Sequence, residues 1–163
     1  PGVHAYMSTD LYNWTDLGVA LRAVTSKSQL TDKSNADYAY FDKAYNLTKS
    51  DGSVDAAKAD AIFPYLNTNP DQDGDGAVDS VQGIFERPKI IYNKKNKQYV
   101  LWWHSDGSTT PGGSNYARAL AGVAVSDNPA GPFTMVPIVC LTRTIGKKPQ
   151  VTPAGVRTVT AAI

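Results

Sequence analysis

The sequence predicts an all-β fold interrupted by a long, mostly irregular insertion that contains one short helix. Residues 89–92 and 99–103 are rich in β-branched and aromatic side chains and flank a polar loop, which is typical of a β-hairpin. A strand-turn-strand unit occurs near the start of the chain and again at residues 121–136. Recurrence of one sheet-forming unit is typical of repeat architectures.

The two copies of this unit share their turn chemistry. In the first, residues 3–7 predict a strand, a turn follows at residues 8–13, and Trp14 precedes a second strand at residues 17–24. In the second, residues 121–125 and 133–136 predict strands around a turn that contains Ser126, Asp127 and Asn128. In both copies a serine closes the first strand and an aromatic residue opens the next.

Residues 26–69 break this β pattern and predict an insertion. Residues 54–63 have the alanine content and spacing of one short helix, which we expect Pro64 to end. Aromatic side chains gather earlier in the segment, and we expect them to pack the insertion more readily than to contact a ligand. They are Tyr38, Tyr40, Phe41 and Tyr45.

Composition excludes several classes of function. The net charge of +1 gives no general electrostatic reason to bind nucleic acid or an acidic membrane surface, and no apolar run approaches the ~20 residues of a membrane span. Cys140, the single cysteine, cannot form an internal disulfide and fits no zinc pattern. Motifs of serine hydrolases, phosphate loops and zinc sites are also absent from the sequence.

An acidic loop at residues 71–82 matches the front of an EF-hand-like calcium loop. Oxygen ligands occupy positions one, three, five and nine, and a glycine occupies position six. Position twelve, where the loop needs a bidentate carboxylate, carries a glutamine, which should weaken binding. The loop is therefore either a structural Ca²⁺ site or a flexible acidic turn. The candidate ligands are Asp71, Asp73, Asp75, Asp79 and Gln82.

Glu86 is the candidate site carboxylate. Pro88 cannot donate to a sheet ladder, so we expect the hairpin to start there and to leave Glu86 and Arg87 just outside the sheet. From residue type alone, a glutamate in this position is most simply a solvated surface charge. Its place at a strand mouth also leaves it free to face a ligand.

The chain resembles the five-bladed β-propeller glycosidases of glycoside hydrolase family 43, and within them the galactan 1,3-β-galactosidase branch. The resemblance rests on Glu-Arg-Pro-Lys at residues 86–89, Tyr-Val-Leu-Trp-Trp-His at 99–104 and GVAVSDNPAGPF at 122–133. It implies an incomplete propeller of about two blades, since a complete one needs roughly 300 residues. With Pro1 inside a strand and no initiator Met, we expect the chain to be a fragment.

The resemblance also implies a division of the chain into four parts. They are the end of one blade at residues 1–25, a rim insertion with the calcium-like loop at 26–85, a second blade at 86–139, and a divergent tail at 140–163. The tail has no carboxylate and does not continue the family's next blade. It is either a natural divergent end or a stretch translated out of frame.

Several site roles are implied only by the resemblance. Glu86 would be the carboxylate that orients the substrate and modulates the pKa of the acid, while the proton-donating glutamate would come from the next blade. Arg87 and Tyr116 would contact the sugar, the alternatives being a surface partner of Glu86 and a core tyrosine. Adjacent strand residues point to opposite faces, so only one of the tryptophans at 102 and 103 can stack on a sugar. The remaining candidate contacts are Trp103, His104 and Asp106.

The predicted function is therefore inverting hydrolysis of a galactan-type polysaccharide, without a catalytic cofactor, by a secreted, periplasmic or cell-surface parent protein. Inversion needs an acid and a base ~6.5–9.5 Å apart. Because the acid's blade is not evident in the sequence, we expect the isolated chain to be inactive. The alternative is a non-catalytic, calcium-stabilised module that binds carbohydrate or a protein.

Overall fold

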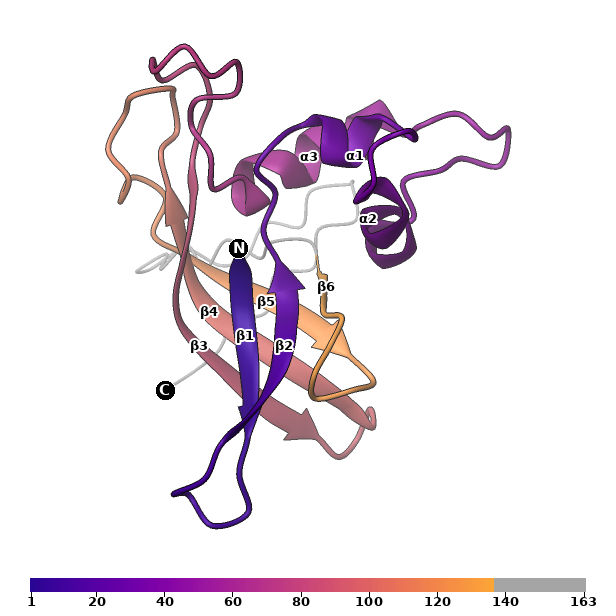
Figure 1. Cartoon of the computed structure of the whole chain (residues 1–163), viewed down its shortest axis with the longest axis vertical. Coiled ribbons are helices and arrows are strands. Elements are labelled where there is room, and N and C mark those ends of the chain that lie inside the picture. The colour runs from indigo at the N-terminus through magenta and orange to yellow at the C-terminus, as the bar shows by residue number, and fades with distance from the viewer. Residues whose placement is uncertain (137–163) are drawn as a thin grey trace, which may run out of the picture.

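Antiparallel strands dominate the computed structural model, which describes residues 1–136. They form two sheets (Figure 1). One is a hairpin of β1 (Gly2–Met7) and β2 (Thr15–Arg22), and the other has the order β3-β4-β5-β6. The second sheet consists of β3 (Gly83–Asn93), β4 (Gln98–Gly107), β5 (Leu120–Ser126) and β6 (Thr134–Met135). Each of its strands pairs with the next along the chain, as in a propeller blade, so the fold is all-β and corresponds to part of a propeller.

The six predicted strands are present, but the predicted start of the central hairpin is wrong. β3 already begins at Gly83, and Glu86 pairs with His104 inside the sheet. The pairing resumes at Lys89 opposite Trp102, so the two residues at 87–88 share a single partner position in a β-bulge. Pro88 is accommodated because the bulge removes it from the ladder that needs its missing N–H.

The insertion contains three helices where the sequence predicted one. They are α1 (Ser28–Thr31), α2 (Tyr38–Tyr45) and α3 (Ala56–Leu66). α3 is the predicted helix, yet Pro64 lies inside it and does not end it. The carbonyl that loses its partner belongs to Asp60, an exposed residue, so water can replace the lost hydrogen bond. α2 was missed because its aromatic-rich sequence carries little helix propensity.

One core joins the two sheets and the helices. Leu101 and Trp103 of β4 face it, together with Leu21 of β2 and Phe41 of α2. In Figure 1, β1 and β2 lie across one face of the four-stranded sheet, and the helices cover one end of this assembly. Burial bears out the packing expected for the insertion's aromatic side chains. Tyr38, Phe41 and Tyr45 are buried, and Tyr40 is partly buried against them.

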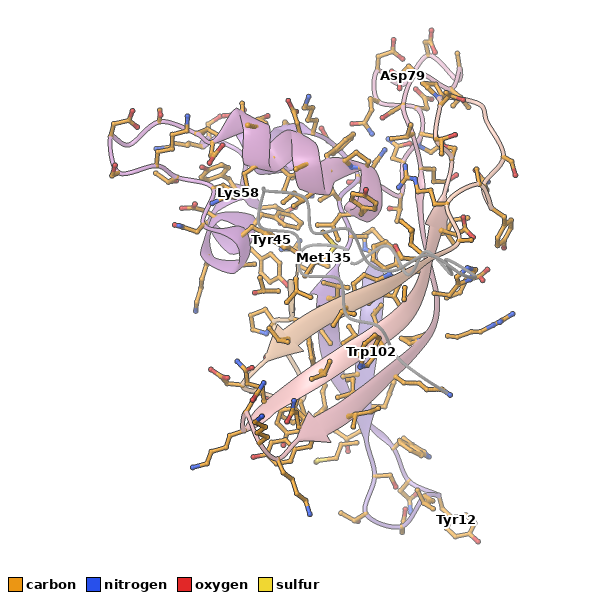
Figure 2. All side chains as sticks on the ribbon, turned by 180° about the vertical axis from the view of Figure 1, so that it is seen from behind. Tyr12, Tyr45, Lys58, Asp79, Trp102 and Met135 are labelled. Carbon is orange, nitrogen blue, oxygen red and sulfur yellow. The ribbon has the colours of Figure 1, made fainter. Side chains whose placement is uncertain are left out.

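The opposite face of the four-stranded sheet is more open. Trp102 points to this face and is 43% exposed, whereas Trp103 is 3% exposed (Figure 2). No helix among the described residues has the length and apolar character needed to cross a membrane. The predicted tail, including Cys140, lies outside the described residues.

Candidate functional site

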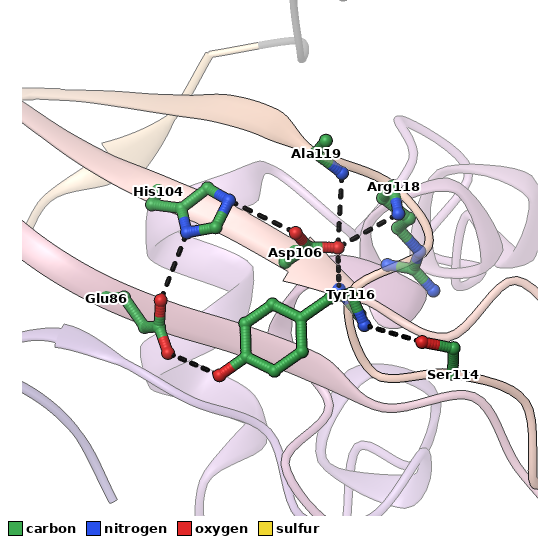
Figure 3. Close-up of polar contacts among 8 residues, drawn as sticks. Glu86, His104, Asp106, Ser114, Tyr116, Arg118 and Ala119 are labelled. Carbon is green, nitrogen blue, oxygen red and sulfur yellow. Dashed lines mark hydrogen bonds and ion pairs between the residues drawn. The ribbon is translucent and has the colours of Figure 1, made fainter.

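Three separate segments bring together four polar side chains, those of Glu86, His104, Asp106 and Tyr116 (Figure 3). Glu86 on β3 lies opposite His104 on β4, so the two side chains share one face of the sheet. Asp106 follows two residues later on the same strand and faces the same way, because successive side chains alternate. Tyr116 comes from the connection between β4 and β5 and reaches back over the sheet.

Both carboxylate oxygens of Glu86 are engaged. The Tyr116 hydroxyl donates to Oε1 at 2.7 Å, and Nδ1 of His104 lies 3.1 Å from Oε2. These two contacts, that from Tyr116 foremost, lower the pKa of the Glu86 carboxyl below its ordinary value, because both favour the charged form. The Glu86 side chain is nevertheless 32% exposed. It is therefore a charged carboxylate in fixed orientation that a ligand can reach.

Asp106 lies behind His104 and is 2% exposed. Its Oδ1 accepts the backbone N–H groups of Gly107, Arg118 and Ala119 at 2.9, 2.9 and 3.1 Å, and its Oδ2 lies 3.1 Å from Nε2 of His104. Burial raises the pKa of the Asp106 carboxyl, but the three N–H donors outweigh it, so the pKa lies below the ordinary value. Such burial excludes the predicted direct contact between Asp106 and a sugar.

The predicted contacts Tyr116 and Arg87 are both accessible. Tyr116 is 60% exposed, and its hydrogen bond to Glu86 raises the pKa of its hydroxyl. It is therefore not a core tyrosine. Arg87 lies exposed in the bulge, at a φ of 53°, next to Glu86 in the chain. Within residues 1–136 no ion pair joins Arg87 to Glu86, so its guanidinium is not tied to that carboxylate.

Trp103 does not fit the predicted role of a sugar platform. Its ring stacks on Phe85, with 5.9 Å between ring centroids, and covers Gly122, where an added Cβ would lie 2.0 Å from the indole. Alternation along β4 turns it into the core and leaves Trp102 on the open face. Trp103 is therefore a core residue.

The acidic loop brings together three of its five predicted ligands. Carboxylate oxygens of Asp71, Asp73 and Asp79 lie within 4.8 Å of one another, and Asp79 is labelled near the top of Figure 2. Asp75 is outside this group, and the Gln82 amide donates instead to the carbonyl oxygen of Thr68 at 3.4 Å. Three carboxylates at such distances suit an oxygen-coordinated cation such as Ca²⁺.

One residue of the site was not predicted. The Arg118 guanidinium donates to the carbonyl oxygens of Pro64 and Ser108 at 2.7 and 2.5 Å and lies over the Tyr65 ring. It ties the Tyr116 segment to the end of α3. An open depression of about 450 Å³ adjoins it and is lined by Pro64, Tyr65, Val81, Thr109, Ala117, Arg118 and Leu120. Sequence spacing carries no signal for Arg118, since its partners are carbonyl groups that only the fold assembles.

Solved structures of family 43 galactosidases and exo-β-1,3-galactanases are among those similar to this chain. No family model and no curated protein matches the chain significantly. Among solved structures it is similar to a family 43 β-1,3-galactosidase bound to galactodeoxynojirimycin, with 26% identity over 83% of this chain and a TM-score of 0.44. It is also similar to an exo-β-1,3-galactanase variant from Phanerochaete chrysosporium bound to β-1,3-galactotriose, with 26% identity over 84% of this chain and a TM-score of 0.43.

A third similar structure is an exo-β-1,3-galactanase from Clostridium thermocellum, with 23% identity over 84% of this chain and a TM-score of 0.40. This chain spans only 24%, 19% and 18% of the three structures, respectively.

Proposed function

We propose that this chain is part of a glycoside hydrolase that acts on a galactan-type polysaccharide, and that Glu86 is the carboxylate that orients the sugar. The observation that carries the proposal is the state of Glu86, which is charged, held at both oxygens and still accessible. A carboxylate of this kind accepts hydrogen bonds from sugar hydroxyl groups. The substrate class, β-1,3-linked galactose, comes from the sequence resemblance around residues 86–104.

The electrostatics of the site favour orientation over proton donation. A general acid must hold a proton at working pH, so its pKa is raised in the enzymes that use one. Glu86 and Asp106 both have lowered pKa values, and Asp106 is also buried. Neither suits the role of the acid in an inverting reaction. The acid and base of the parent enzyme would therefore be other groups, and we expect this chain alone to bind sugar weakly without turnover.

Arg87 and Tyr116 supply the remaining contacts of the proposed site. The Tyr116 ring is exposed beside the carboxylate that its hydroxyl orients, and aromatic faces pack well on the apolar face of a sugar ring. Arg87 directly follows Glu86 in the chain and is exposed, so its guanidinium is available to donate to sugar hydroxyl groups. Because a polysaccharide does not cross a membrane intact, the proposal places the parent protein outside the cell or in the periplasm.

Sugar titrations followed by NMR test the proposal. We expect β-1,3-galactobiose to shift the signals of Glu86 and Tyr116 with a Kd on the order of 1 mM or weaker. The Glu86→Gln variant should bind at least roughly tenfold more weakly, a loss of about 1.4 kcal/mol. The matched control is Asp16→Asn, which removes an exposed carboxylate beside His4, away from the site. This variant should bind the sugar normally.

Three results would contradict the proposal. The first is binding of the disaccharide that leaves the Glu86 signal unchanged, and the second is equal binding of β-1,4-xylobiose. The third is a clear rate of galactose release by this chain that Glu86→Gln abolishes, because an orienting carboxylate without its acid should not turn over substrate.

The second candidate function is a calcium-stabilised module that binds carbohydrate or a protein without catalysis. The gathering of the Asp71, Asp73 and Asp79 carboxylates favours it. The two candidates differ in the parent protein at full length. Release of galactose from β-1,3-galactan supports the hydrolase, whereas calcium-dependent binding without release supports the module.

A further inference from the structure

Asp106 is the one member of the site that no ligand can reach, yet its carboxylate makes more contacts than any other group there. Its Oδ1 accepts three backbone N–H groups, and its Oδ2 faces His104. Buried charges persist only where they are paired and hydrogen-bonded. We therefore expect a role of the Asp106 carboxylate other than contact with substrate.

The first task concerns the protons of His104. Its Nδ1 and Nε2 each lie 3.1 Å from a carboxylate oxygen, of Glu86 and of Asp106 respectively. A charged carboxylate only accepts hydrogen bonds, and a neutral imidazole has one donor. Both contacts are hydrogen bonds at the same time only if both ring nitrogens carry protons. Whichever nitrogen carries the proton, the ring is held between the two carboxylates, and Asp106 fixes the edge of the ring that faces Glu86.

The second task concerns Tyr116. Oδ1 of Asp106 accepts the N–H groups of Arg118 and Ala119, the latter at a φ of 48°, and so shapes the turn that follows Tyr116. The Tyr116 ring stacks beside His104, with 6.5 Å between centroids, and its hydroxyl reaches Glu86. Both groups that hold Glu86 are therefore anchored on the same buried carboxylate.

We propose that Asp106 is a positioning residue that holds Glu86 in place through His104 on one side and through the Tyr116 turn on the other. The proposal deepens the proposed function and rests on it for the role of Glu86. Two other charged groups lie near these three side chains. Arg87 follows Glu86 in the sequence, and the Arg118 guanidinium donates to the carbonyl groups of Pro64 and Ser108. Neither arginine has an ion pair with Glu86 or Asp106 among the described residues.

Asp106→Asn separates the two tasks. The asparagine oxygen can still accept the backbone N–H groups of Arg118 and Ala119, so the turn should persist. Its amide NH₂ would face Nε2 of His104, and a donor there requires that Nε2 give up its proton. The asparagine therefore favours the His104 tautomer that is protonated at Nδ1, whereas the Asp106 carboxylate favours a proton on Nε2.

NMR of this chain can observe both the His104 imidazole and the Glu86 carboxyl. Glu86 is its only glutamate and His104 one of two histidines, so selective labelling produces one glutamate carboxyl signal and two imidazole signals. His4→Gln assigns the imidazoles. We expect a proton on Nε2 of His104 in the wild type and none on Nε2 in Asp106→Asn. The carboxyl signal of Glu86 should shift as well, because the proton then held on Nδ1 lies beside Oε2.

Asp16→Asn, which removes the carboxylate beside His4, is the matched control and should leave the titration of Glu86 unchanged. If Asp106→Asn does not fold, His104→Gln tests the same contact from the other side, because it removes the imidazole and leaves the buried carboxylate. It should raise the pKa of the Glu86 carboxyl, since the contact from His104 is one cause of its lowered value. A wild-type His104 without a proton on Nε2, or an unchanged Glu86 signal in the variants, overturns the proposal. The experiment contains no sugar, so its failure is distinct from failure of the proposed function.

Discussion

The hydroxyl of Tyr116 donates to Oε1 of Glu86 at 2.7 Å, although the two residues are far apart in the chain. This hydrogen bond is the largest cause of the lowered pKa of the Glu86 carboxyl, and the contact from His104 is the next. Through this lowered pKa, the protonation of Glu86 should make the unfolding free energy depend on pH. That dependence can be measured without substrate.

The folded protein should lose the stabilisation from Glu86 in acid. Because its pKa is lower folded than unfolded, its contribution is fully present above the ordinary value and is lost as pH falls through the folded pKa. We therefore expect the difference in unfolding free energy between wild type and Glu86→Gln to be constant near neutrality and to shrink below about pH 4.5. Chemical denaturation at a series of pH values measures it.

Tyr116→Phe provides the matched control for this pH effect. It keeps the carboxylate and removes only the hydroxyl, so the pKa of Glu86 should move up toward its ordinary value. A pH-independent difference between wild type and Glu86→Gln would contradict the lowered pKa. So would an unchanged Glu86 titration in Tyr116→Phe.

Gly122→Ala should destabilise the four-stranded sheet. An added Cβ would lie 2.0 Å from the Trp103 indole, a contact that requires the ring or the strand to shift. Overpacking of this kind costs roughly 1–3 kcal/mol of unfolding free energy, which urea denaturation resolves. In a Trp103→Phe background the substitution should cost less, since the smaller ring removes the atoms that clash. Equal cost in both backgrounds would contradict the predicted clash.

Asp37 should anchor the insertion to β2 more strongly than an exposed ion pair could. Its oxygens accept from Arg22 and from the buried Gln29, each at 2.7 Å. Asp37→Ala leaves both partners unsatisfied and should cost roughly 1–3 kcal/mol of unfolding free energy. The matched control is Asp60→Ala, which breaks an equally short but more exposed pair with Lys27 and should cost less than about 1 kcal/mol. Equal losses would argue against an anchoring role.

Calcium should stabilise the protein through the acidic loop. If Asp71, Asp73 and Asp79 hold the ion, Ca²⁺ at a hundred times its Kd adds about 2.7 kcal/mol to the unfolding free energy. Thermal melts with Ca²⁺ and with EDTA measure the shift in Tm. Asp79→Asn should abolish most of it and Asp60→Asn should not. An identical Tm in Ca²⁺ and EDTA would leave the loop as an acidic turn.

Much of the strand framework could be predicted because it is written in local patterns. The β3-β4 hairpin follows from two runs of β-branched and aromatic residues around a polar loop, and each run is short enough to assess alone. The bulge at Arg87 and Pro88 could not be predicted. Proline explained why the ladder is interrupted, but only the pairing on both sides of it shows that the strand continues to Gly83.

The second helix and the orientation of the tryptophans could not be predicted either, because both depend on how the core packs. α2 has weak helix propensity and forms where Phe41 and Tyr45 can be buried against the sheets, a contribution that no local window contains. Alternation showed that Trp102 and Trp103 point to opposite faces. Which face is the core depends on where β1 and β2 pack, so the sequence could not show that Trp103, the predicted sugar contact, is buried.

The sequence by itself determined the strands of the two repeated units and the acidic loop, which depend on residue types and spacings within a few positions of each other. It pointed to Glu86 only through the family resemblance. Only the tertiary structure decided that Asp106 is buried behind His104, that Tyr116 holds Glu86, and that Arg118 ties their loop to α3. The reason is physical, because hydrogen bonds between distant segments depend on where the folded backbone brings donors and acceptors together.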